Sequence, residues 1–416
     1  MLSGFATASV SFQGNWFGVT AAGVSPDYTT QSGVLGLSSN FRRITVGGPN
    51  PADRNVIAGS GRDSSNPPLP GGGSNTVRTE SAAGDRAVIL FQGNLFGFAP
   101  DGITPLPFRD PLVVQCGTEA EMADIRFLDN RFGRAMRTFG GGFGGAARFN
   151  VSRVMTAPAV VQGNVFGLGV DGSRSGVERG HIEVFLGNNT QVPRLQIGGL
   201  LAGQANVFAA GIRQQASLPG GSALTLPTGT VSTFVEFAGN RMLGNDGIGL
   251  DFPTGTAGGG VSFGRSANDA DDADTGANNQ QNFPKLTSFG VSGNQFSVNY
   301  RVDSTPANSA YPLRVDFYKA LGDEGEVLLG SDVYASASAQ QSKSATLSIP
   351  AGTSLGADDV VVAIATDAQG RSSEFSFDLL SLAVSDTPDP HPAGLPFTVS
   401  IDALALEGPF KPNGVV

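Results

Sequence analysis

The chain has 416 residues, which is long enough for more than one domain. Its formal net charge of -10 argues against binding to nucleic acid or to an anionic membrane surface, because those partners are themselves negative. A single cysteine excludes an internal disulfide, two histidines leave no Cys/His zinc site, and no apolar run reaches the length of a membrane span.

The first two thirds of the chain is a repeat array. One twelve-residue phrase occurs three times, as FQGNWFGVTAAG from Phe12, FQGNLFGFAPDG from Phe91 and VQGNVFGLGVDG from Val161. Weaker echoes extend the pattern to seven asparagines, 34 to 42 residues apart, at Asn15, Asn55, Asn94, Asn130, Asn164, Asn206 and Asn240. This periodicity predicts stacked units that share one continuous core.

Each unit contains short runs of Val, Ile and Phe broken by Gly, Asn, Asp and Pro, which is typical of strands and turns. The alternatives are a β-propeller, with blades of about 40 to 50 residues, and a parallel β-helix, with coils of about 20 to 30 residues. Corners of variable length favour the β-helix, with one or two coils in each period.

The repeated asparagine has a physical role in such a coil. A sharp corner needs a left-handed residue, which Asn and Gly tolerate best, and stacked Asn side chains can hydrogen-bond from coil to coil. Two positions further along, an aromatic stack at about 4.8 Å per layer is expected inside the coil. Its members are Phe17, Phe96, Phe132 and Phe166.

Near residue 285 the pattern changes to strict alternation, as in 296–302 and 313–317, with a buried-type run at 360–364. Alternation of this kind predicts an antiparallel β-sandwich of immunoglobulin type. The expected fold is therefore a right-handed parallel β-helix followed by a smaller antiparallel β-sandwich. The expected domains are 1–286 for the helix, 287–382 for the sandwich, and 383–416 for a proline-rich linker with a terminal strand.

Three further phrases mark the end of the array and the following domain. They read GIGLDF from Gly247, DADTGANNQQNFP from Asp272 and ATDAQGRSSEFS from Ala365. With the repeats, they resemble large bacterial secreted or surface proteins that have right-handed parallel β-helix repeats of the IQGNYIG and IGG...NVISGN type and a C-terminal sandwich.

That resemblance implies an exported protein, extracellular or on the cell surface, although no signal peptide is visible at Met1. The expected function is a non-catalytic structural or adhesive module, a rigid stalk whose loops, such as 60–75, meet a glycan or a cell-surface partner. We expect the sandwich to protect one end of the stacked coils. The other end is a candidate for end-to-end self-association.

The best candidate for a metal site is an acidic segment consisting of Asp251, Asp269, Asp271, Asp272 and Asp274. Carboxylates packed into a short loop repel one another unless something neutralises them, and hard oxygen ligands suit Ca²⁺. A structural calcium ion would stiffen the junction between helix and sandwich. The alternative is a solvated loop whose carboxylates cap turns.

An alternative function is a polysaccharide lyase or glycoside hydrolase acting in a groove of the β-helix, since these reactions need paired carboxylates or a calcium ion with a basic residue. His181, Glu183, Glu236 and Asp246 stand outside the repeat, but each is interpreted as a surface residue because nothing in the sequence brings two of them together. Trp16, the only tryptophan, is the sole candidate for an exposed sugar-stacking ring. One structural observation distinguishes the two functions. The enzyme requires that two or more non-repeat carboxylates, or a carboxylate and an arginine, converge in a groove along one sheet.

Overall fold

The structure is a computed structural model, and the part that it describes is all-β. The described residues are 8–23, 35, 37–38, 42–58, 76–79, 88–106, 112–116, 124–134, 146–151, 155, 157–178, 180–186, 194–212, 221–226, 232–255, 261–262, 264–322, 324–356, 358–377 and 379–380. Within them the only helical elements are the 3₁₀ turns η1 (Pro51–Asp53), η2 (Ala277–Gln280) and η3 (Ser336–Ser338). The expected linker and terminal strand at 383–416 and the loop at 60–75 lie outside these residues.

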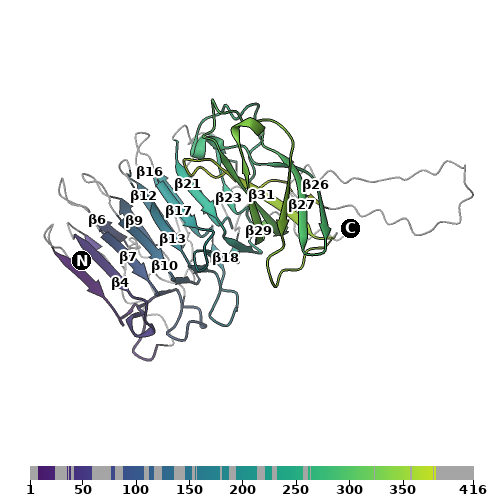
Figure 1. Cartoon of the computed structure of the whole chain (residues 1–416). Coiled ribbons are helices and arrows are strands. Elements are labelled where there is room, and N and C mark those ends of the chain that lie inside the picture. The colour runs from purple at the N-terminus through teal and green to yellow at the C-terminus, as the bar shows by residue number, and fades with distance from the viewer. Residues whose placement is uncertain are drawn as a thin grey trace, which may run out of the picture. The chain divides into compact units, whose positions relative to one another are not determined.

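The repeats form a parallel β-solenoid built from three seven-stranded sheets (Figure 1). The first sheet consists of β1 (Ser9–Phe12), β4 (Arg43–Gly47), β7 (Val88–Gln92), β10 (Asp124–Leu128), β13 (Ala159–Gln162), β17 (Arg194–Gly198) and β21 (Phe234–Ala238). The second consists of β2 (Trp16–Phe17), β5 (Val56–Ile57), β8 (Leu95–Phe96), β11 (Arg131–Phe132), β14 (Val165–Phe166), β18 (Val207–Ala209) and β22 (Arg241–Leu243). The third consists of β3 (Leu37–Ser38), β6 (Thr76–Thr79), β9 (Leu112–Cys116), β12 (Ala147–Val151), β16 (Ile182–Leu186), β20 (Leu224–Thr225) and β23 (Leu250–Asp251).

Each sequence period makes one coil, which settles the choice between one and two coils per period. A coil contributes one strand to the first sheet, turns at the asparagine, and then contributes one strand to the second sheet and one to the third. Two short additional pairs occur, β15 (Val177–Glu178) with β19 (Gly211–Ile212), and β24 (Thr254–Gly255) with β25 (Val261–Ser262).

The seven repeated asparagines lie in one line along the corner between the first and second sheets. The side chain of Asn130 is typical. Its Oδ1 accepts hydrogen bonds from Asn94 N at 3.1 Å and from Asn94 Nδ2 at 2.9 Å, while its Nδ2 donates to Asn164 Oδ1 at 3.0 Å and to Phe91 O at 2.9 Å. The hydrogen bond from the side-chain nitrogen of one asparagine to Oδ1 of the next recurs along the line from Asn15 to Asn240. All of these asparagines except Asn15 are buried.

At five of the seven corners the residue before the asparagine, and not the asparagine itself, is left-handed, whereas Arg54 before Asn55 has φ -62°. Gly93 has φ 69° and Gly163 has φ 68°, while Asp129 holds the same conformation at φ 56°. A glycine is also required at the end of β4, in the segment Val46-Gly47-Gly48. A Cβ on Gly47 would lie 2.0 Å from Gln92 O, so only glycine lets the next coil approach this closely.

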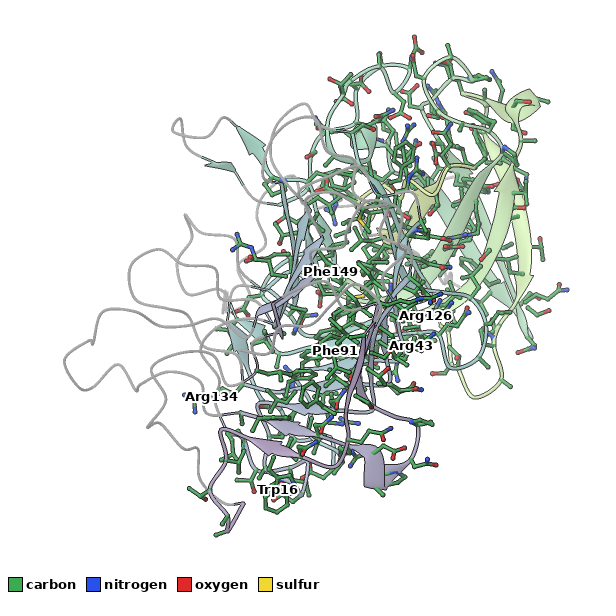
Figure 2. The ribbon with its side chains drawn as sticks, turned by 90° about the vertical axis from the view of Figure 1, so that its left-hand side faces the viewer. Trp16, Arg43, Phe91, Arg126, Arg134 and Phe149 are labelled. Atoms are coloured by element: carbon green, nitrogen blue, oxygen red, sulfur yellow. The ribbon has the colours of Figure 1, made fainter. Side chains whose placement is uncertain are left out.

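Phenylalanines fill the interior in stacks along the solenoid, where Figure 2 shows Phe91 and Phe149. Phe96, Phe132 and Phe166 stack with ring centroids 4.6 Å apart and planes within 6°, and Phe208 continues the column at 4.8 Å. The predicted stack is therefore confirmed for three of its four members. Phe17 is separated from Phe96 by Ile57, which occupies the same position in the second coil.

After the solenoid the chain forms two antiparallel sheets that enclose a second core. One sheet consists of β26 (Lys285–Ser292), β27 (Gln295–Arg301) and β30 (Lys343–Ser348). The other consists of β29 (Glu324–Tyr334), β28 (Leu313–Leu321), β31 (Val360–Thr366) and β32 (Leu379–Leu380). Tyr300, Phe317 and Tyr334 pack in the space between them. The predicted antiparallel sandwich is confirmed.

The last strand of the first sheet, β21, has its open edge covered by polar groups from the following segments. Asn278 Oδ1 accepts from Val235 N at 3.0 Å, and Asn278 Nδ2 donates to Val235 O at 2.7 Å. Ser372 N donates to the same carbonyl at 3.1 Å, and Ser372 Oγ accepts from Phe237 N at 2.9 Å. These groups of Asn278 and Ser372 take the place of the strand that a further coil would supply. The backbone groups that they bond on β21 cannot pair with another chain.

The cover extends beyond β21. Tyr318, in the sandwich, accepts from Gly239 N through its hydroxyl at 2.9 Å. The carboxylate of Glu374 accepts from Phe252 N at 2.7 Å and from Ser266 N at 2.6 Å. Burial raises the pKa of Glu374 to about 8, against the effect of these two amides.

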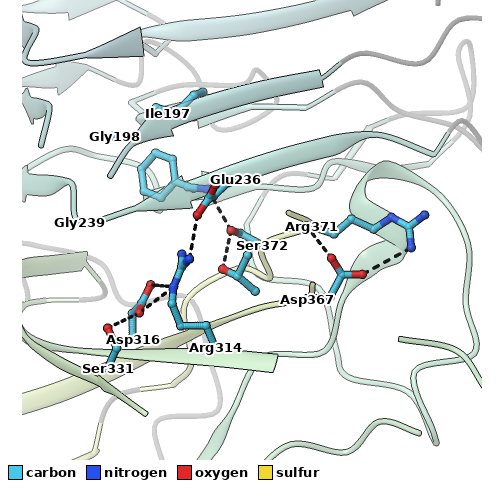
Figure 3. Close-up of polar contacts among 12 residues, drawn as sticks. Ile197, Gly198, Glu236, Gly239, Arg314, Asp316, Ser331, Asp367, Arg371 and Ser372 are labelled. Carbon is cyan, nitrogen blue, oxygen red and sulfur yellow. Dashed lines mark hydrogen bonds and ion pairs between the residues drawn. The ribbon is translucent and has the colours of Figure 1, made fainter. Parts of the chain in front are cut away.

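An ion-pair network crosses the same boundary (Figure 3). Arg314 on β28 donates through Nη1 to Glu236 on β21 at 2.8 Å, and through Nε to both oxygens of buried Asp316 at 3.1 Å. Ser331 Oγ also donates to Asp316, at 2.6 Å. Among the covering groups, Asn278 belongs to the phrase that begins at Asp272, and Ser372 and Glu374 belong to the phrase that begins at Ala365, whereas Tyr318 and Arg314 lie outside the phrases.

Candidate functional sites

Three of the five predicted metal ligands converge in the loop before η2. Asp269, Asp272 and Asp274 each place a carboxylate oxygen within 4.8 Å of the others. Asp272 is buried and already well bonded, since Oδ1 accepts from Asn282 N at 2.8 Å, and Oδ2 accepts from Gln281 Nε2 at 2.7 Å and from Ser309 Oγ. This carboxylate therefore ties the loop to the sandwich.

The other two predicted ligands lie apart from this group. Asp251, at the end of β23, is 1% exposed and accepts from Gly264 N at 3.2 Å and from Ser222 Oγ at 3.3 Å. Asp271 is exposed and accepts a hydrogen bond from Gln340 Nε2.

Without a counter-charge, the negatively charged forms of these three carboxyl groups are disfavoured by burial and by their mutual repulsion. Burial raises the pKa of Asp272 to about 6, and burial followed by the charge of Asp269 raises that of Asp274 to about 6. Asp274 Oδ1 is shielded from solvent and has no hydrogen-bond partner among the described residues. A hard cation with oxygen ligands fits this donor set.

A second group of polar residues lies in register on the third sheet. Arg148 on β12 pairs with Glu183 on β16, Glu183 pairs with Thr225 on β20, and Thr225 pairs with Asp251 on β23. Their neighbours along the strands, such as Ile182, belong to the core, so these four side chains face outward. We call these four residues the outer row.

The outer row combines opposite charges with little exposure. Arg148 Nε lies 3.9 Å from Glu183 Oε2, and their side chains are 14% and 7% exposed. Burial lowers the pKa of Arg148, and the charge of Glu183 opposes that shift. The row therefore places a carboxylate and an arginine side by side on one sheet, which is the arrangement that would favour polysaccharide chemistry.

The interpretation of His181 and Glu183 as surface residues was wrong. His181 is completely buried between Phe166 and Phe208, with ring centroids 5.7 and 5.6 Å away, and its Nε2 lies 3.1 Å from Asn245 Oδ1. Burial lowers the pKa of His181 to about 4, so the imidazole is neutral at pH 7.

The remaining non-repeat candidates lie elsewhere. Glu236 forms an ion pair with Arg314 at the covered end of the solenoid, and Asp246 is exposed. Trp16 is 48% exposed on the first coil, so its ring is accessible, as the sugar-stacking hypothesis requires (Figure 2).

Sequence reasoning did not find Arg148 or Thr225. Both lie on the third sheet, where no phrase repeats, and the alignment of β12, β16 and β20 appears only when the coils are in register. Among the described residues, no helix has the length and apolarity needed to cross a bilayer. No protein-family model matches the sequence, and no curated protein matches it significantly.

Proposed function

We propose that this chain is a non-catalytic extracellular structural and adhesive module, a rigid β-solenoid stalk that presents its outer surfaces to a glycan or another cell-surface partner. The observation that carries this proposal is the continuous line of buried asparagines. Each step joins neighbouring coils through two hydrogen bonds, so bending the solenoid at this corner would break bonds that water cannot replace.

The covered end supports the same role. The groups that saturate β21 satisfy its backbone, so this edge of the solenoid is not available for pairing with another strand. The apolar interior, with its column of stacked rings, adds stiffness.

A polysaccharide lyase or hydrolase is the second candidate, and the outer row favours it. Glu183 and Asp251 are two strands apart, which corresponds to about 9.6 Å between their backbones. That spacing resembles the separation of about 6.5 to 9.5 Å between the carboxyl groups of inverting glycosidases. Against it, Asp251 is almost fully buried and bonded to Gly264, which leaves no room for a sugar at that carboxylate.

Product assays separate the two candidates. The purified protein is incubated with neutral and acidic polysaccharides, with and without calcium, and new reducing ends and unsaturated products are measured. We expect neither product above a heat-inactivated control. Product that disappears in Glu183→Gln would establish the enzyme and reject the non-catalytic module.

We further propose that Asp269, Asp272 and Asp274 hold a structural calcium ion. The shielded Oδ1 of Asp274 would provide one open ligand, and the cation would offset the repulsion among the three carboxylates. The loop connects the covered end of the solenoid to the sandwich, so the ion would stiffen this junction.

Calcium is expected to raise the melting temperature of the wild-type protein by several degrees at pH 7.5, because the ion binds the folded loop and not the unfolded chain. Asp274→Asn should abolish the shift, since it removes a charge but preserves the shape of the side chain. Differential scanning calorimetry with 1 mM CaCl₂ or 1 mM EDTA measures the effect. Asp101→Asn, in an exposed solenoid turn, is the control and should keep the full shift; an equal shift in Asp274→Asn would reject the site.

A further inference from the structure

The repeated twelve-residue phrase continues past the asparagine corner, and the fold of the coil does not require its last part. Complete copies of the phrase occur only in the first, third and fifth coils, where the phrase ends in a turn that leaves the second sheet. Gly23, Gly102 and Gly172 close these turns with φ of 70°, 69° and 83°, and the amide of each donates to the carbonyl three residues earlier. Alternate coils therefore carry the same turn.

These turns contact one another, although a further coil lies between each pair. A Cβ on Gly23 would lie 3.2 Å from Trp16 Cζ3 in its own coil and 3.1 Å from Pro100 Cγ in the third coil. The next step repeats this packing, since a Cβ on Gly102 would lie 2.9 Å from Val170 Cγ1 in the fifth coil. Val170 N also donates to Gly102 O at 3.0 Å. The glycine that ends the phrase lets the next turn pack directly over it.

Contacts from beneath hold the turns in place. Arg131, in the fourth coil, donates through Nη1 to Leu168 O at 2.7 Å and to Gly169 O at 2.8 Å. Phe98 is buried beneath the third-coil turn, where it packs with Leu95 in an apolar cluster apart from the main core. The stacked turns therefore form a fixed outer layer over the second sheet.

The surface of this layer combines an apolar line with two carboxylates. Trp16 is 48% exposed and Val170 is 50% exposed, and Pro100, at the position equivalent to Val170, is partly exposed (Figure 2). Asp101 and Asp171 are exposed at equivalent positions of their turns. A side-chain hydroxyl in each turn donates to the carboxylate and lowers its pKa, so both groups are ionised at pH 7. We call these five residues the turn ridge.

We propose that the turn ridge binds an extended neutral polysaccharide with β-1,4 linkages. The exposed indole of Trp16 can stack on the apolar face of a sugar ring, and the carboxylates accept hydrogen bonds from sugar hydroxyls. Equivalent turns lie two coils, or about 9.6 Å, apart, which is comparable to the length of the repeating disaccharide in such a polymer. Successive turns therefore meet equivalent sugars. The proposal rests on the adhesive function above and specifies its ligand and its site.

The turn ridge fits a neutral glycan better than it fits other partners. A stable protein interface takes about 20 to 30 residues from each side, whereas the ridge offers three apolar side chains in a single line. An acidic polysaccharide would be repelled by Asp101 and Asp171 and by the net charge of -10. A neutral sugar chain has apolar ring faces and hydroxyl edges, which match the two kinds of side chain.

Fluorescence of the full chain tests the assignment, because Trp16 is the only tryptophan and its emission reports on the ridge alone. The protein is titrated with hydroxyethyl cellulose, galactomannan and arabinoxylan, with alginate as the anionic polymer. We expect at least one neutral polymer to shift the emission to shorter wavelength, and alginate to leave it unchanged. Affinity gel electrophoresis with the same polymers measures binding independently of the indole.

Trp16→Ala should weaken binding to the neutral polymer about tenfold, and Trp16→Tyr should keep most of the affinity. Val170→Asp places a charge in the apolar line of the fifth coil and should also weaken binding about tenfold. The matched control is Leu201→Ala, which truncates an apolar side chain that is 72% exposed outside the ridge and should leave binding unchanged. Circular dichroism and melting temperature identify variants that do not fold, and Val170→Asp provides the test if Trp16→Ala does not.

The outcomes separate the turn ridge from the adhesive function. Retardation by a neutral polymer with unchanged Trp16 emission, and equal affinity in a folded Trp16→Ala protein, would overturn the ridge and leave the adhesive function standing. No retardation by any neutral polymer would also overturn the ridge. Binding at the ridge accompanied by new reducing ends would support the site and reject only the non-catalytic function.

Discussion

Asn130→Ala is expected to remove roughly 3 to 5 kcal/mol from the free energy of unfolding, because it leaves several buried polar groups without partners. The lost side chain accepts from Asn94 N and Nδ2 and donates to Phe91 O and Asn164 Oδ1. Water cannot reach these groups in the middle of the solenoid. Urea unfolding followed by far-UV circular dichroism measures the loss.

Asn15→Ala is the matched control, since it removes the same amide from the first coil, where the side chain is exposed. There water replaces the lost partners, and the expected loss is below about 1 kcal/mol. Equal losses in the two variants would mean that the line of asparagines stabilises the solenoid only through the local turn, and the rigid-stalk argument would lose its main support.

Asn278→Gly is expected to uncover the edge of β21. The side chain is fully buried, with φ 48°, and makes hydrogen bonds to Val235, Thr233 and Ser372. Glycine tolerates this conformation, so the change removes the amide without adding backbone strain. We expect a loss of about 2 to 4 kcal/mol and faster amide hydrogen exchange at Val235 and Phe237.

Uncovered backbone groups also predict concentration-dependent association through the strand edge, which multi-angle light scattering detects. Asn279→Gly is the matched control, because Asn279 has φ 55°, is partly exposed, and its side chain accepts one bond from Ser232. It should remain a monomer with near-normal exchange. A monomeric Asn278→Gly protein with unchanged exchange would show that other contacts suffice to cover the edge.

The sequence predicted the solenoid because its restraints are local and periodic. Each coil places an apolar side chain beside the corner, and Phe96, Phe132 and Phe166 recur there two residues after their asparagines. The sandwich was equally predictable, since the alternation in 313–317 places Leu313, Val315 and Phe317 in the core of the sandwich.

The sites were harder to predict for a physical reason. Arg148, Glu183 and Thr225 meet only after the coils are aligned, and the segments that lead to the third sheet vary in length, so no spacing in the sequence indicates the register. The contacts that cover β21 were difficult to predict for the same reason, since Ser372 is 135 residues from Phe237 in the sequence. Burial of His181 was missed because a polar residue inside an aromatic column leaves no periodic signal.

The line of asparagines also gives the solenoid a direction. At every step from Asn15 to Asn206, the main-chain and side-chain nitrogens of one residue point to the oxygen of the next, so all the amide dipoles are parallel. Within the line, the nitrogens of each asparagine therefore face the following coil, and its Oδ1 faces the preceding coil. The line is therefore polar along the solenoid axis, and reversing one coil within it would oppose donor with donor on one side and acceptor with acceptor on the other.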